Sequence, residues 1–132
     1  MNENINGSAQ DMDVRRQQLE LLESVTEYAP KAIGELKKLS AEFYGVKQED
    51  SDEYLDFVLE NSNWMLEALN ATIDLINEET QMIDRGQANQ AVLDLNDALA
   101  SKVDARIADA LEKGLIPLLE NYMIAAQNLT EK

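Results

Sequence analysis

The stretch that decides the fold reads DSDEYLDFVLENSNWMLEALNATIDLINEETQMIDR and covers residues 50–85. Apolar residues recur in it every three or four positions, which is the spacing of one face of an α-helix. In a heptad frame that takes Leu55 as position a, the a and d positions include Leu55, Val58, Ser62, Met65, Leu69, Thr72, Ile76 and Ile83. The pattern predicts one unbroken central helix of about ten turns that ends at Gly86.

The sides of this helix are apolar as well. Position e adds Leu59, Leu66 and Ile73, position g adds Tyr54, Ala68, Leu75 and Met82, and position c adds Phe57, Trp64 and Ala71. Only positions b and f are uniformly polar. A helix that is apolar around most of its circumference must be covered from several sides. The cover is either the rest of this chain or another molecule, and the sequence leaves both open.

A second amphipathic helix is predicted before the central one, from residue 13 to residue 44. Its apolar stripe steps by three and four residues through Leu22, Val25, Ala29, Ala32, Leu36, Leu39 and Phe43. Pro30 lies inside this helix, and proline removes a backbone donor and usually kinks or breaks a helix. Because the apolar phase is the same on both sides of Pro30, we expect a kink. Gly45 then marks the end of the helix.

After a short turn the helical pattern restarts at Ala88 and predicts a third long helix. Its apolar positions are Val92, Leu95, Leu99, Val103, Ile107, Leu111, Leu115, Leu118, Tyr122, Ala125 and Leu129. Gly114 and Pro117 interrupt the pattern, and a glycine followed by a proline often marks a helix end and a new start. Two alternatives stay open, a kinked continuous helix and a break that is followed by a short fourth helix.

Together these patterns predict an all-α fold, an antiparallel up-down bundle of three long helices in which the first and third run parallel. The first and third helices are kinked or broken at Pro30 and Pro117, which allows four to five helical segments. Residues 1–10 are polar and aperiodic, which predicts a disordered leader. Residues 11–130 are expected to form a single helical-bundle domain that is long enough to bury a core without disulfides.

Acidic residues dominate the charge of the chain. It has 26 Asp and Glu against 11 Lys and Arg, no His, and a net charge of -15 at pH 7. Such a surface repels phosphates and anionic lipids, so neither nucleic acid nor a membrane is an expected partner. Cysteine is absent, which excludes disulfides and thiol chemistry. The first residues do not resemble a signal peptide, and we expect a cytoplasmic protein.

Motifs for catalysis are sparse. Without His and Cys the chain lacks the usual zinc ligands and the partners of a serine or cysteine triad. Its five glycines are scattered and form no phosphate-binding loop. We therefore predict no catalytic residue, no metal site and no cofactor.

Two carboxylate pairs give the one enzymatic alternative. Glu20 with Glu23, and Glu53 with Asp56, have the spacings E-x-x-E and E-x-x-D. This arrangement resembles that of the all-helical MazG-type nucleoside triphosphate pyrophosphohydrolases. The resemblance implies that the four acids hold Mg²⁺ against the phosphates of a nucleotide.

For function we expect a non-catalytic acidic interaction protein, an adaptor or a chaperone-like binder of a partner protein's amphipathic helix. In size, charge and helix content the chain resembles the small acidic helical chaperones of bacterial secretion and flagellar systems. The expected binding residues are side chains on the flanks of the central helix, of types that interface centres favour: Phe57, Trp64, Tyr54, Ala68 and Leu75. Two alternatives remain, that these side chains belong to the core and that a second copy of the chain covers them in a homodimer.

Overall fold

The structure is a computed structural model that describes the backbone of residues 2–131 and the side chains of residues 12–131. Four helical runs make up this part of the chain, and the last run is continuous across three pieces. The elements are α1 (Asn2–Tyr44), α2 (Ser51–Ile76), α3 (Arg85–Ser101), α4 (Asp104–Ala110), the π-helical turn η1 (Leu111–Leu115) and α5 (Ile116–Thr130). Residues 2–131 contain no strand, so the all-α fold is confirmed.

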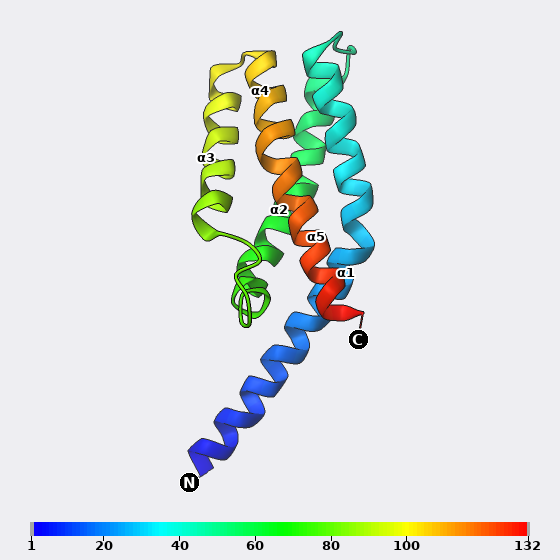
Figure 1. Cartoon of the computed structure of the whole chain (residues 1–132). Coiled ribbons are helices and arrows are strands. Elements are labelled where there is room, and N and C mark those ends of the chain that lie inside the picture. Colours follow the sequence, from blue (N-terminus) through cyan, green and yellow to red (C-terminus); the bar gives the residue numbers. More distant parts are fainter. Residues whose placement is uncertain (1, 132) are drawn as a thin grey trace.

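The runs alternate in direction, as Figure 1 shows. α1 rises from the N-terminus, α2 returns beside it, α3 rises again, and the run from α4 to α5 descends between α1 and α3. The contacts of α1 with this last run confirm the direction, because Tyr44 bonds to Asp109 while the earlier Lys37 pairs with the later Glu120. The structure therefore has four runs where the sequence predicted three. It also corrects the expected parallel pairing, since the first and last helices are antiparallel.

The additional reversal lies at Lys102 and Val103, inside the third predicted helix. Lys102 adopts a left-handed conformation with φ 58° and ψ 22°, and its N–H donates to the carbonyl of Leu99 at 3.2 Å. The Ser101 hydroxyl donates to the carbonyl of Ala98 and accepts from the N–H of Val103. This turn uses neither glycine nor proline, and the apolar residues around it keep a helical spacing. The pattern therefore concealed the turn, and Val103 is exposed where the sequence placed it in the core.

The central helix α2 also ends earlier than predicted, at Ile76. Asn77 follows it and holds the next loop in place. The side-chain amide of Asn77 donates to the carbonyl of Ile83 at 2.9 Å, and its oxygen accepts from the N–H groups of Met82 and Ile83 at 2.9 and 3.1 Å. Ile83 is buried although it lies in the loop, so it matched the heptad pattern without being helical. Asp84 then caps the start of α3 with its side chain.

Both prolines lie within continuous helix. Figure 1 shows α1 changing direction between its dark blue N-terminal part and its cyan C-terminal part, the interval that contains Pro30. Pro117 follows η1 at the start of α5. A π-helical turn is a local irregularity that a helix can contain without ending, and here it precedes the residue that lacks an N–H. The helix continues past both prolines, so the alternative of a break is excluded at each.

The leader that the sequence predicted to be disordered, residues 1–10, has a helical backbone from Asn2 onward. Figure 1 shows this end of α1 projecting away from the other helices. Met12 and Val14, the first apolar side chains that the structure describes, are exposed. A helical end without packing contacts is only marginally stable in water. The disorder of the leader in solution therefore stays a prediction.

One hydrophobic core fills the bundle. The whole stripe predicted for the first helix, from Leu22 to Phe43, is buried. Buried residues of α2 and α5 pack in the same core: Leu55, Val58, Met65, Ala68, Leu69, Ile73, Leu75, Ile76, Ile116, Leu118, Leu119, Tyr122, Ala125 and Ala126. The loop before α3, α3 itself, α4 and η1 add the rest: Ile83, Ala88, Ala91, Leu95, Ala98, Ile107, Ala108, Leu111 and Leu115. Burial of this apolar surface is the main force that holds the four runs together.

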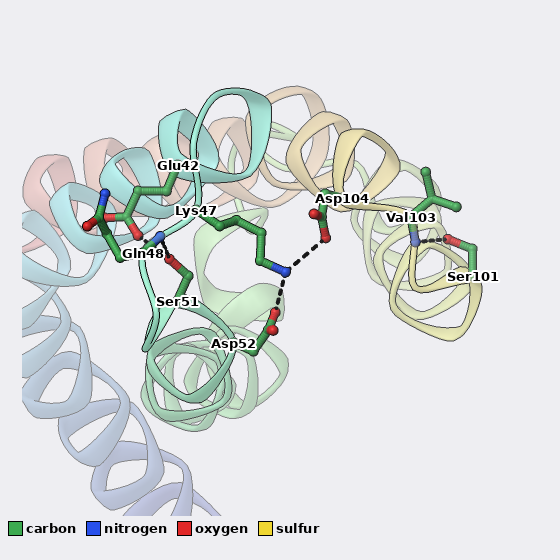
Figure 2. A network of polar contacts seen from close by, with 8 residues as sticks. All are labelled: Glu42, Lys47, Gln48, Ser51, Asp52, Ser101, Val103 and Asp104. Carbon is green, nitrogen blue, oxygen red and sulfur yellow. Dashed lines mark hydrogen bonds and ion pairs between the residues drawn. The ribbon is translucent and has the colours of Figure 1, made fainter.

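Polar contacts close the end of the bundle at which α1, α2 and α4 meet (Figure 2). Lys47, in the loop between α1 and α2, pairs with Asp52 at 2.9 Å and with Asp104 at 3.2 Å. The pKa of Lys47 is raised, first by its hydrogen bond to Asp52. The buried Ser51 hydroxyl donates to the carboxylate of Glu42 at 2.7 Å and accepts a backbone N–H of the loop at 2.7 Å. This network fixes the loop and, with it, the pairing of α1 with α2.

The hydroxyl of Ser62 is buried in α2 and has no hydrogen-bond partner among the described residues. We expect Ser62→Ala to raise the free energy of unfolding by about 1 kcal/mol, because it removes a polar group that loses its water on folding and gains nothing in return. Ser51→Ala is the matched control and is expected to lower it by about 1 kcal/mol, since Ser51 makes two hydrogen bonds. Urea unfolding of both variants measures the difference, and a destabilised Ser62→Ala would contradict the assignment.

Candidate functional site

The open face of the α1–α2 pair carries the two aromatic residues that the sequence singled out. Phe57 is 56% exposed and Trp64 is 38% exposed. They lie seven residues apart on α2, and this spacing places them on the same side of the helix. Large exposed aromatic side chains are common at binding surfaces. The alternative that Phe57 and Trp64 belong to the core does not fit these exposures.

Tyr54 lies partly buried between α2 and α1. Its hydroxyl donates to the carboxylate of Glu35 at 2.8 Å, and the ammonium of Lys38 lies 5.5 Å from the centre of its ring. The hydrogen bond to Glu35 is the largest cause of the raised pKa of Tyr54. Tyr54 is therefore engaged by α1, and its role in binding a partner stays a prediction.

Ala68 and Leu75, the other two predicted binding residues, lie in the core. Ala68 is 3% exposed and Leu75 is 6% exposed. Both occupy the g positions that the sequence assigned to an uncovered flank, and the structure places that flank against the rest of the chain. The prediction that Ala68 and Leu75 line an open surface is therefore wrong.

Tyr28 of α1 is the aromatic neighbour of Trp64. Their ring centres lie 5.6 Å apart with an interplanar angle of 84°, an edge-to-face arrangement. This geometry is favourable for two aromatic rings. Burial raises the pKa of Tyr28, and the negative charge of Glu35 adds to the rise.

An open groove of about 570 Å³ lies beside this aromatic pair. Three residues of α1 and three of α2 line it: Ser24, Glu27, Tyr28, Glu60, Asn61 and Trp64. We call this the Trp64 groove. Its walls combine aromatic surface with two carboxylates, one from each helix. Neither Glu27 nor Glu60 forms an ion pair within the described part of the chain.

Sequence reasoning found Trp64 but missed the α1 side of this groove. Ser24, Glu27 and Tyr28 lie on one side of α1 through the spacings i, i+3 and i+4. A signal was present, because two antiparallel helices joined by a short loop can be aligned residue by residue from that loop. Such an alignment would have placed Tyr28 near Trp64.

The four acids of the pyrophosphohydrolase alternative do not assemble into a site. Glu20, Glu23, Glu53 and Asp56 all have exposed side chains. Across the described side chains no group of three or more carboxylates is placed to hold a metal ion. The structure therefore gives this alternative no geometric support.

The fold and the site together define a class, an all-α four-helix domain with an aromatic and acidic groove on one face. The family described as Domain of unknown function (DUF8042) matches residues 20–125, and the chain belongs to this family. The match covers all three α1 residues and all three α2 residues that line the Trp64 groove. No curated protein and no solved structure matches the chain. Within the described residues, no helix is long and apolar enough to cross a membrane.

Proposed function

We propose that this domain is a cytoplasmic, non-catalytic adaptor or chaperone-like protein that binds a basic amphipathic helix of a partner protein. The binding surface is the open face of α1 and α2 around Phe57 and Trp64. The observation that carries the proposal is the exposure of these two aromatic residues beside a groove that other side chains of the chain leave open. An amphipathic helix is a common occupant of such a surface, because its apolar stripe matches a groove between two helices.

Charge supports a basic partner. The net charge of the chain is -15, and the groove itself contains Glu27 and Glu60. A basic helix would be attracted to this face, whereas a second acidic copy of the chain would be repelled. The charge therefore favours the adaptor over the homodimer, the alternative in which the same face pairs with itself.

Binding to a partner from the source cell tests the proposal. The wild-type protein is used as bait, each retained protein is purified, and its dissociation constant is measured with the purified domain. We expect the double variant Phe57→Ala, Trp64→Ala to weaken binding at least about 10-fold, because buried aromatic anchors contribute most to interface affinity. The control is Leu93→Ala, Ile124→Ala, which removes two exposed apolar side chains from α3 and α5.

Circular dichroism first confirms that both double variants are folded. A partner that binds the Phe57, Trp64 variant as well as the wild type would contradict the proposal. In parallel, light scattering over a range of concentrations measures the mass of the free domain. A mass that doubles in the wild type and stays single in the Phe57, Trp64 variant would favour the homodimer instead.

A further inference from the structure

We infer that the Trp64 groove is an anchor pocket for an arginine side chain of the partner helix. The inference rests on the proposed function and specifies the chemistry by which the domain recognises its partner. It follows from three observations. Trp64 is partly exposed and packs against Tyr28, the groove is lined by Glu27 from α1 and Glu60 from α2, and no Lys or Arg is among the residues that line it.

The aromatic surface of the groove is already formed in the free domain. Tyr28 contacts Trp64 edge to face, while 38% of the Trp64 surface stays open to solvent. The faces of an indole ring attract cations more strongly than those of any other side chain. Because Tyr28 already packs against the indole, a cation that docks on the ring has less side-chain motion to restrict.

The carboxylates come from both helices. Glu27 lies on α1 and Glu60 on α2, and both line the groove. A cation that enters the groove is attracted by the negative charge on each of its two walls. Lys31 follows Glu27 by one helical turn, but the structure shows no ion pair between them within the described side chains. No basic residue lines the groove, so a positive charge that neutralises its two carboxylates has to come from a bound partner.

The arrangement favours arginine over lysine. A guanidinium is planar, so it can stack on the indole of Trp64 while its N–H groups reach carboxylates on two sides. An ammonium is a point charge that is more strongly hydrated and makes only one of these contacts well. Phe57 lies about two turns before Trp64 on the same side of α2, and it offers apolar contact to the rest of a bound helix. This extended surface fits a side chain carried by a helix and not an isolated small cation.

The test uses the full chain and the signal of its indole N–H, which is unambiguous because Trp64 is the only tryptophan. N-acetyl-L-arginine amide is titrated into the ¹⁵N-labelled protein. N-acetyl-L-citrulline amide, which has the same shape but no charge, is the control probe. We expect the arginine probe to shift the indole signal to saturation with a dissociation constant of about 1–10 mM, and the citrulline probe to leave it in place.

Two variants make the test specific. Glu27→Gln, Glu60→Gln is expected to weaken binding of the arginine probe at least about 10-fold, because it removes both carboxylates of the groove. Glu49→Gln, Glu79→Gln changes the net charge by the same amount in the two loops at the ends of α2, and is expected to bind like the wild type. An equal shift with citrulline, an unshifted indole, or equal binding by both double variants would overturn the inference.

The outcomes separate this inference from the proposed function. If a partner binds through Phe57 and Trp64 but the arginine probe does not shift the indole, the pocket assignment is wrong and the adaptor function stands. If the probe binds as expected but every retained protein binds the Phe57, Trp64 double variant as tightly as the wild type, the pocket stands and the proposed function fails.

Discussion

Replacing Leu119 with alanine is expected to lower the free energy of unfolding by about 3 kcal/mol, the middle of the range for a fully buried leucine. Leu119 is 0% exposed in α5, and α5 packs against both α1 and α2. Alanine leaves a cavity inside a close-packed core, and the neighbouring helices can collapse into it only in part. Chemical unfolding at pH 7, followed by far-UV circular dichroism, measures the loss as a shift in midpoint.

Leu93→Ala is the matched control for this experiment. Leu93 is 56% exposed on α3, so the same substitution there is expected to change the free energy of unfolding by less than about 0.5 kcal/mol. A loss below about 1 kcal/mol for Leu119→Ala would show that α5 is not packed against α1 and α2 as described. Since domains of this size are stable by about 5–15 kcal/mol, the variant should still fold and the loss should be measurable.

The helices and the core of this fold were largely readable from the sequence, because burial imposes a period on the apolar residues. The stripe from Leu22 to Phe43 is the clearest case, since all of it is buried. The direction change between α3 and α4 was not readable in the same way. The turn at Lys102 is made by backbone conformation and by a serine side chain, and neither disturbs the spacing of apolar residues. Periodicity reports which side of a segment is buried and does not report whether the segment reverses.

The end of α2 also could not be predicted from the spacing of apolar residues. Ile83 continues the heptad pattern and is buried, but it reaches the core from a loop that the side chain of Asn77 holds. An apolar residue at the right position is buried in either case. The hydrogen bonds of Asn77 hold the loop in which the helix ends, and they form only when that loop is folded.

Only some residues of the candidate site could be predicted from the sequence. Phe57 and Trp64 could be found because they lie at the same heptad position and outside the main stripe. Ala68 and Leu75 were assigned to the surface because the spacing of apolar residues does not show how far the other helices cover α2. Tyr28 was missed because its significance depends on a neighbour in another helix, 5.6 Å away across the groove. Positions on one helix follow from spacing, whereas contacts between helices require the register of the pair.

Tyr122 is expected to make the stability of the protein fall between pH 10 and pH 12. It is fully buried, and burial is the main reason why its pKa is raised from 10.0 to about 12. Its hydroxyl lies 2.8 Å from that of Thr72, which itself donates to the carbonyl of Ala68 at 2.7 Å. Because the Thr72 hydroxyl donates its proton to Ala68, we infer that the neutral Tyr122 hydroxyl donates to Thr72. Loss of the phenolic proton would leave a charge in the core, and a hydrogen bond from the Thr72 hydroxyl would offset this cost only in part.

The direction follows from where each state binds its proton. Below pH 10 the folded and unfolded states are both protonated at Tyr122, and the full stabilisation is present. Between pH 10 and pH 12 the unfolded state loses its proton while the folded state keeps it, so stability falls by about 2–3 kcal/mol in total. Above pH 12 both states are ionised and this contribution stays lost. Tyr28, Tyr44 and Tyr54 also have raised pKa values, so the wild-type curve alone does not isolate Tyr122.

Comparison of the wild type with Tyr122→Phe isolates the contribution of Tyr122 to the pH dependence of stability. At pH 7 the variant is expected to be less stable by about 1 kcal/mol, because it lacks one hydrogen bond while Thr72 keeps its bond to Ala68. Phenylalanine has no proton to lose, so the variant escapes the alkaline decline that Tyr122 causes. The two stability curves, measured by urea unfolding at each pH, should therefore cross between pH 10 and pH 12, with the variant more stable at the upper end. Parallel curves over this interval would show that Tyr122 ionises as readily in the folded state as in the unfolded one, which a buried phenol in this core cannot do.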